Sequence, residues 1–122
     1  MPYRYRKDER LRKNRDFIAA MKGKRLSFDG LSLFYAPNDT GRFRVGLSVG
    51  KKLGNAVHRN RLRRRLRDCI SRTLRNDSLG YDLVFVARSQ IADAGHEELI
   101  RIVTAVLQRT VLRSRRPEGT AP

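Results

Sequence analysis

Arginine is concentrated in one short stretch of the sequence, and its side chain is suited to binding phosphate. Six of the nine residues from 59 to 67 are Arg. A guanidinium group binds a phosphate through two parallel hydrogen bonds and stacks on exposed bases. Asn60, inside the run, can read a base edge or a ribose 2′-hydroxyl. The stretch therefore predicts contact with RNA, and the simpler alternative is a basic surface helix that binds polyanions loosely.

This stretch is expected to lie on a long amphipathic helix over residues 55–75. Apolar or small residues recur at three- and four-residue spacing and form one stripe, which comprises Leu62, Leu66, Cys69, Ile70, Thr73 and Leu74. At about 100° per residue, the arginines leave this helix in two directions. A solvent-facing set comprises Arg61, Arg64, Arg65, Arg72 and Arg75. Arg63 and Arg67 border the stripe, and Arg59 points towards it from the first turn.

No group of residues in the sequence is arranged for catalysis by the protein. The 12 acidic residues are scattered, without the paired spacing of a two-metal nuclease. His58 and His96 have no neighbouring partner that would make a general base, so a satisfied or solvent-exposed role is expected for both. Cys69 lies alone on the apolar stripe and is expected to be a buried structural thiol.

Charge and composition indicate a polyanionic partner. Lys and Arg outnumber Asp and Glu 28 to 12, which gives a formal net charge of +16 at neutral pH. Such an excess in 122 residues repels itself unless an anion compensates it. Nucleic acid fits better than a membrane, because no apolar run reaches the length of a spanning helix and no signal peptide is recognisable. A cytoplasmic location is therefore expected.

The rest of the sequence predicts one small α+β domain. Polar, basic residues over 1–13 predict a flexible arm, and residues 114–122 predict a disordered tail, which leaves one RNA-binding domain over 14–113. Its hydrophobic periodicity predicts the order α-β-β-α-β-α, a two-layer sandwich of helices on one sheet. The elements are a helix over 14–22, strands over 31–36 and 43–49 that form a hairpin, the helix over 55–75, an interior strand over 81–87 and a helix over 93–112.

The strand over 43–49 has one face of small residues. Val45 and Leu47 lie on its core face, whereas Arg44, Gly46 and Ser48 lie on the opposite face. Such a face either leaves the backbone open to the close approach of a ligand or is the ordinary solvent-facing side of an antiparallel pair.

Two adjoining segments resemble the signature of the bacterial ribonuclease P protein family. The strand ends Val-Gly-Leu-Ser-Val-Gly-Lys-Lys at residues 45–52, and Gly-Asn-Ala-Val-His-Arg-Asn-Arg-Leu-Arg-Arg follows at 54–64. The Arg-Asn-Arg at 59–61 is the hallmark of that family. Residues 13–17 resemble the start of its N-terminal helix and residues 81–88 its third strand. The resemblance thus spans roughly residues 10 to 112.

The resemblance implies a fold and a function. The family has an α/β sandwich with a left-handed βαβ crossover, shared with a ribosomal-protein domain. Its members are subunits of a ribonucleoprotein in which a catalytic RNA, with Mg²⁺, removes the 5′ leader of precursor tRNA. The partners implied here are therefore the catalytic RNA and precursor tRNA, and neither DNA nor a membrane. The protein would carry no catalytic residue, and the Mg²⁺ would be required by the RNA rather than held by protein side chains.

The same resemblance implies two groups of binding residues. The catalytic RNA would contact Lys51, Lys52, Arg59, Asn60, Arg61, Arg63, Arg64, Arg65 and Arg67. A cleft between the first helix and the open sheet face would hold the single-stranded leader, lined by Asn14, Phe17, Met21, Phe34, Arg44, Ser48 and Arg88. Unpaired bases stack readily on aromatic rings, although a place in the core is the alternative for Phe17 and Phe34. Met21 stands where the family often has a second aromatic residue.

Three other classes of protein fit parts of the sequence. A structural ribosomal protein would have the same charge and a similar fold, but would need no affinity for a single-stranded leader. A DNA-binding regulator is disfavoured, because its recognition helix usually follows another helix and here a strand precedes the basic helix. An autonomous nuclease is disfavoured by the scattered acidic residues.

Overall fold

The computed structural model describes residues 10–11, 14–74 and 80–112. The helices are α1 (Asn14–Met21), α2 (Ala56–Leu74) and α3 (His96–Gln108), with short 3-10 helices η2 (Lys51–Leu53) and η3 (Ser89–Ile91). The strands are β1 (Lys24–Phe28), β2 (Leu31–Pro37), β3 (Arg44–Val49) and β4 (Tyr81–Ala87). The predicted tail, and the predicted arm apart from residues 10–11, lie outside the described residues.

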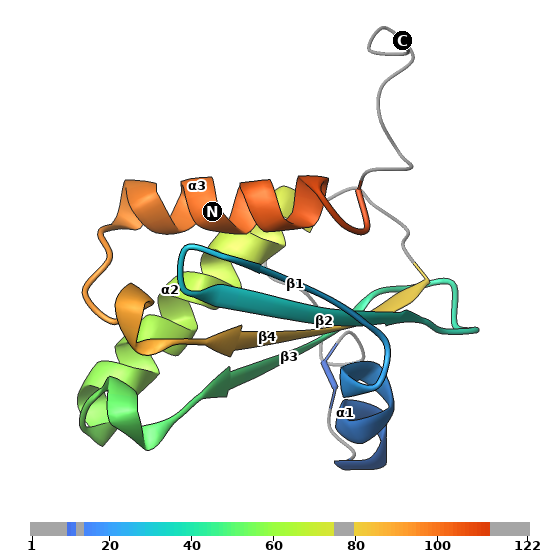
Figure 1. The fold of residues 1–122 in the computed structure, drawn as a ribbon, viewed down its shortest axis with the longest axis horizontal. Helices are drawn as coiled ribbons and strands as arrows, with labels where there is room; N and C mark the ends of the chain where they lie inside the picture. The colour runs from blue at the N-terminus through green and yellow to red at the C-terminus, as the bar shows by residue number, and fades with distance from the viewer. Residues whose placement is uncertain (1–9, 12–13, 75–79, 113–122) are drawn as a thin grey trace, which may run out of the picture.

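The four strands form one mixed sheet in the order β1-β2-β4-β3 (Figure 1). β4 pairs antiparallel with β2 and parallel with β3, so the predicted interior position of this strand is confirmed. The predicted hairpin between the strands now called β2 and β3 is wrong, because β4 lies between them. An interior strand is covered on both faces of the sheet, which suits the apolar residues that β4 carries on each face. The turn after β2 lies beside the start of β4, where the Asn38 amide donates to the Gly80 carbonyl at 2.8 Å.

β1 is a strand that the hydrophobic pattern did not predict, so the order is α-β-β-β-α-β-α. It lies at the edge of the sheet and pairs antiparallel with β2. Leu26 and Phe28 pack against the core, whereas Lys24, Arg25 and Ser27 are exposed. Edge strands tolerate charged residues, because one side of the strand faces solvent. A strand with two apolar residues gives too short an alternation to be recognised in the sequence.

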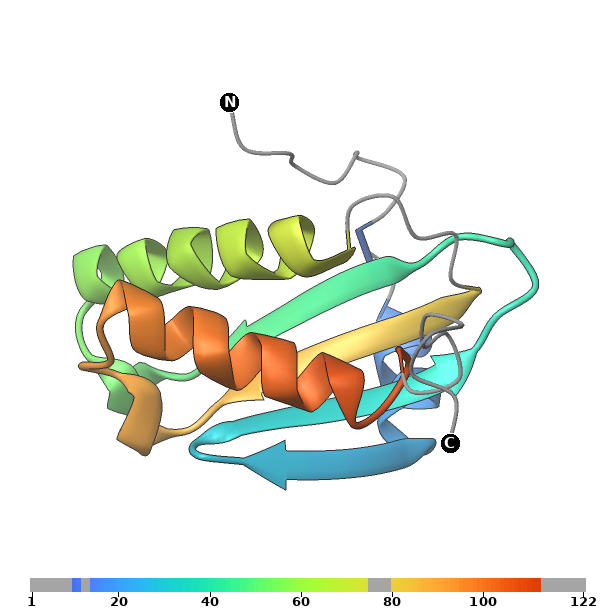
Figure 2. The same cartoon turned by 90° about the horizontal axis from the view of Figure 1, so that it is seen from above.

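The β3-α2-β4 unit has a left-handed crossover, as the family resemblance implied. Figure 2 views the sheet from the side of α2 and α3, and both parallel strands run towards the left with β4 below β3. With the strands turned to point upward, the chain therefore moves to the left as it passes through the helix in front. Most crossovers between parallel strands have the opposite hand.

Helices cover the two faces of the sheet unequally. α2 and α3 pack on one face and enclose the main hydrophobic core, to which β2, β3 and β4 contribute Leu33, Val45 and Phe85 (Figure 1). The shorter α1 packs on the other face over a small cluster of Leu11, Ala20 and Val84, joined by the half-buried Phe17, Phe34 and Val86. The predicted α+β sandwich is thus confirmed, with α1 as a partial third layer.

The apolar stripe on α2 anchors the arginine-rich helix to the sheet. Leu62, Leu66, Cys69, Ile70 and Leu74 are each 3% exposed or less. The helix begins after Asn55, whose Oδ1 accepts a hydrogen bond from the His58 amide at 2.9 Å. This side chain satisfies a backbone donor that the first turn would otherwise leave unpaired. The stripe and the cap together fix which side of α2 faces solvent.

Cys69 is a buried thiol, as its place on the apolar stripe predicted. Its side chain is 1% exposed, and desolvation raises the pKa of its thiol to about 11. Because the thiolate is the reactive form, we expect a thiol reagent at neutral pH to label Cys69 roughly a hundredfold more slowly in the folded protein than in urea. The labelling rate of the folded protein should rise with pH as the thiol ionises. Equal rates in the folded and unfolded chains at neutral pH would show that the thiol is accessible.

Candidate RNA-binding surfaces

Most of the residues expected to contact RNA lie on the outer side of α2 and on η2, which we call the arginine surface. The exposed members are Lys51, Lys52, Asn60, Arg61, Arg64 and Arg65, and the half-buried members are Arg59, Arg63 and Arg67. Among the described residues, neither Arg61 nor Arg64 has an ion-pair partner. Arg63 Nη1 donates to Asn60 Oδ1 at 2.7 Å, which fixes the orientation of that amide. These side chains present cations and one oriented amide to solvent.

The turn before α2 is held by a glycine and a histidine. Gly54 has φ 128°, in the region that favours glycine, and a Cβ there would lie 2.8 Å from the His58 ring. His58 Nε2 in turn lies 3.1 Å from the Ala92 carbonyl oxygen, in the segment before α3. The expectation that the His58 ring is hydrogen-bonded within the protein is therefore confirmed. This contact ties the start of the arginine surface to the rest of the fold.

A small hollow lies between α2 and the start of α3. Its volume is about 250 Å³, and its lining comprises Arg61, Arg64, Arg65, Asp68 and His96. Arg65 Nη1 donates to the Ala94 carbonyl at 3.3 Å, so this arginine leans towards α3. The arginine surface thus continues from α2 onto the N-terminal end of α3.

On the opposite face of the sheet, the ring of Phe17 rests directly on β3. A Cβ added to Gly46 would lie 2.5 Å from Phe17 Cε1, so only a glycine allows this approach. The small-residue face of β3 therefore admits α1 at Gly46, and neither alternative considered for that position, ligand or solvent, applies there. Phe34 lies in the same cluster, with the Arg25 guanidinium 5.9 Å from its ring centroid. Both rings belong to the small core and remain half-buried.

Beyond α1 the same sheet face opens into a cleft of about 950 Å³. Its walls include two of the residues expected to bind the leader, Ser48 and Arg88, and two of those expected to bind the catalytic RNA, Lys51 and Lys52. Further polar lining comes from Ser27, Ser32, Ser89 and Gln90. The cleft thus joins the two groups of expected binding residues at one point, whereas the other members of the two groups lie apart.

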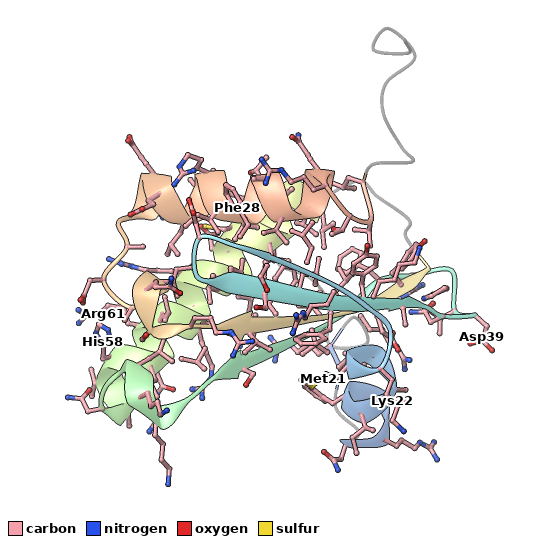
Figure 3. All side chains as sticks on the ribbon, viewed as in Figure 1. Met21, Lys22, Phe28, Asp39, His58 and Arg61 are labelled. Atoms are coloured by element: carbon pink, nitrogen blue, oxygen red, sulfur yellow. The ribbon has the colours of Figure 1, made fainter. Side chains whose placement is uncertain are left out.

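The other expected leader-binding residues lie around α1. Asn14 is exposed, as are Met21 (45%) and Ile18 (48%), and the buried side of α1 is formed by Phe17 and Ala20. Figure 3 shows Met21 and Lys22 at α1, far across the molecule from His58 and Arg61 on α2. Arg44 is held by Asp82 and Asp16.

Sequence reasoning missed the contribution of β1 and of the serines beside it. Ser27 Oγ lies 2.7 Å from Ser32 Oγ, and Arg88 Nε donates to Ser32 Oγ at 3.4 Å. The alternation of Ser32 and Phe34 in β2 was the available signal, because alternate residues of a strand share one face. Arg25 had no such signal, since its strand was not recognised.

Two features of the described residues concern metal binding and membrane insertion. Among them, no three His, Cys, Asp or Glu side chains are gathered as a metal ion would require. None of the described helices combines the length and apolar character needed to cross a membrane.

The fold and its two surfaces define a class of small, basic α+β proteins with a left-handed crossover and an arginine-rich helix. The sequence model of the family Ribonuclease P matches residues 5–111. The ribonuclease P protein component of Clostridium novyi (strain NT) is 38% identical over 110 residues, which cover 88% of this chain and 97% of that protein. The chain therefore belongs to the ribonuclease P protein family.

Solved structures agree with this assignment. The RNase P protein of Staphylococcus aureus superposes with a TM-score of 0.77 at 30% identity, covering 84% of this chain and 96% of that one. The RNase P protein from Thermotoga maritima gives a TM-score of 0.75 at 28% identity, with 83% and 96% covered. The fold and the family implied by the sequence resemblance are confirmed.

The contact between Phe17 and Gly46 generates a prediction. We expect Gly46→Ala to push Phe17 and α1 away from the sheet and to lower the free energy of unfolding by about 1–3 kcal/mol, as overpacking does. Gly50→Ala is the matched control, because a Cβ at Gly50 meets nothing within 4 Å. Urea unfolding of the two variants measures the difference. Equal stabilities would contradict the close packing of Phe17 on β3.

Proposed function

We propose that this chain is the protein subunit of a ribonuclease P ribonucleoprotein that assists removal of the 5′ leader from precursor tRNA. The arginine surface binds the catalytic RNA, and the sheet face beside α1 holds the leader. The observation that carries the proposal is the cleft of about 950 Å³, which runs from the open sheet face to Lys51 and Lys52 at the edge of the arginine surface.

Charge on α2 supports a contact with folded RNA. Arg61 and Arg64 are exposed and lack an ion-pair partner among the described residues, so their charges are available to phosphates. Arg59 is half-buried, and its Nε has no hydrogen-bond partner in the described part of the chain. A buried donor left unpaired is unfavourable. If the Arg59 side chain turned outward to an RNA acceptor at the first turn of α2, the penalty would be removed.

The sheet face supports a path for a single strand. Alternate residues of each strand make successive rows across the sheet, and the paired registers place Gly46, Val84 and Phe34 in one row and Ser48, Val86 and Ser32 in the next. Arg88 follows at the end of β4. A leader crossing these rows would pass from an apolar and aromatic region to hydroxyl groups and then to cations. This order suits base stacking followed by contacts to sugar and phosphate.

The work of this chain in the reaction would be binding and positioning. The catalytic RNA would supply the hydrolytic chemistry together with its Mg²⁺. Cations of the arginine surface would neutralise phosphates that repel one another when the RNA folds. The sheet face would hold the leader so that the bond to be cut is correctly placed, which converts binding free energy into a gain in rate.

The comparisons favour this function over the ribosomal-protein alternative, because the matched proteins are ribonuclease P protein components. The leader site separates the two by experiment. Replacing Phe17 or Phe34 with Leu should weaken binding of precursor tRNA to the assembled ribonucleoprotein and leave binding of the mature tRNA unchanged.

The direct test is cleavage of a 5′-extended precursor tRNA by a bacterial ribonuclease P RNA at low Mg²⁺ concentration, with and without this chain. We expect the protein to be inert by itself and to raise cleavage by the RNA by about tenfold or more, at the 5′ end of the mature tRNA. Binding of the RNA without any change in cleavage would refute the proposed function. Cleavage by the protein without RNA would refute it as well.

Salt dependence tests the arginine surface. If Arg64 contacts a phosphate, Arg64→Ala should weaken binding to the RNA and reduce the slope of log K against log salt by about 0.7–0.9. Arg101→Ala removes the same charge from α3, where Arg101 lies 3.2 Å from Asp29, and should leave the slope unchanged. Filter-binding titrations over a salt series measure both slopes. Equal slopes for the two variants would place Arg64 outside the RNA contact.

A further inference from the structure

Arg44 lies on the sheet face proposed for the leader, yet its guanidinium group is engaged within the protein. Nε donates to Asp82 Oδ1 at 2.7 Å, and Nη2 donates to Asp82 Oδ2 at 2.8 Å. The third nitrogen, Nη1, lies 3.5 Å from Asp16 Oδ2 on α1. The hydrogen bond to Asp82 is the main cause that raises the pKa of Arg44. All three nitrogens therefore face carboxylates.

Asp82 makes this arrangement difficult to open. It is 7% exposed, lies on the interior strand β4 and is opposite Arg44 in the parallel register with β3. Its Oδ1 also accepts a hydrogen bond from Asn38 Nδ2 at 2.8 Å. If Arg44 turned away to bind a phosphate, it would leave a buried carboxylate without its cation, which is strongly unfavourable.

Asp16 makes the same arginine a link between the sheet and α1. Asp16 lies in the first turn of α1, one residue before Phe17, whose ring rests on Gly46. The opposite side of this helix of 8 residues carries the exposed Ile18 and Met21. α1 is thus held from one side, and the ion pair from Arg44 secures the end of the helix that begins beside β3.

We propose that Arg44 is a positioning residue, and that the Asp82–Arg44–Asp16 bridge sets where α1 lies over the sheet and so how well the leader fits beside it. The inference rests on the proposed function, because it assigns α1 to the leader site. It gives Arg44 an indirect part in the leader site, whereas the resemblance implied that Arg44 lines the cleft itself.

Asp16→Asn distinguishes this role from long-range electrostatic attraction, because the two predict opposite changes in affinity for the leader. The substitution removes one negative charge and so raises the net charge by one, and long-range attraction alone would tighten binding of any RNA. Loss of the bridge instead loosens α1 and weakens binding of the leader. Arg44 stays paired with Asp82 in this variant, so the fold is retained. Removal of a partly exposed ion pair of this kind changes affinity by roughly two- to fivefold.

The experiment measures precursor tRNA and leaderless mature tRNA on the assembled ribonucleoprotein, for the wild-type chain, Asp16→Asn, Asp16→Glu and Glu98→Gln. Glu98→Gln is the matched control, because Glu98 also lies in the first turn of a helix and 3.8 Å from an arginine, on α3. We expect Asp16→Asn to raise KM for precursor tRNA roughly two- to fivefold with unchanged kcat and an unchanged salt slope. Mature tRNA binding should stay the same, Asp16→Glu should restore KM, and Glu98→Gln should have no effect.

The outcomes separate this inference from the proposed function. A wild-type ribonucleoprotein that binds precursor and mature tRNA equally well would overturn the leader site itself, before any variant is considered. A wild-type preference for precursor that Asp16→Asn keeps or strengthens would overturn the positioning role alone. An equal loss in Glu98→Gln would overturn it too, because the effect would then belong to helix termini or charge in general.

Discussion

The rest of the structure depends on the burial of β4, the strand with apolar residues on both faces. Val84 and Phe85 point to opposite sides of the sheet and are each 1% exposed or less, so both faces near the middle of this strand need a cover. α2 and α3 provide it on one face with a large core. On the other face the described part of the chain supplies α1, a helix of 8 residues, which covers the Val84 row. The next row, which contains Ser48 and Ser32, is polar and borders the cleft. The proposed leader site is thus the part of the sheet that the short helix does not reach.

The cations of this protein divide into two groups according to their partners. Arg44 and Arg101 are paired with carboxylates, and Arg109 lies 4.4 Å from the ring centroid of Phe28, so these side chains have interactions within the fold. Arg61 and Arg64 have no such partner among the described residues, and they lie on the arginine surface. With 28 basic residues against 12 acidic ones, most cations cannot be paired internally. The acidic residues in these pairs are therefore informative, because each marks a cation that is engaged within the fold rather than available to RNA.

The sequence predicted the elements whose apolar residues recur at a clear period. It failed where contacts between distant segments determine the structure. The stripe of α2 and the interior position of β4 follow from apolar spacing, and both are confirmed. β1 was missed because an edge strand with Leu26 and Phe28 as its apolar residues shows almost no pattern. The pairing of β2 with β4 rather than β3 depends on contacts across more than 40 residues, which local turn signals do not encode. The ion pairs of Arg44 could not be predicted either, since Asp16 and Asp82 lie far from it in the sequence. The register of β3 against β4 places Asp82 beside Arg44, and the position of α1 places Asp16 there.

The two proposed binding surfaces belong to one continuous segment, which explains why the recognisable motif is contiguous. Gly46 receives α1, Ser48 borders the cleft, and η2 follows directly with Lys51 and Lys52. Gly54 then allows the turn that leads into α2, and Asn55 caps the helix that carries the arginines. β3 is paired in the sheet with β4, and α2 is packed on the sheet through its apolar stripe, so both ends of the segment are anchored to the same sheet. A leader on one face and a folded RNA on the other would therefore be held at a set separation. This relation is the physical means by which the chain would direct the place of cleavage.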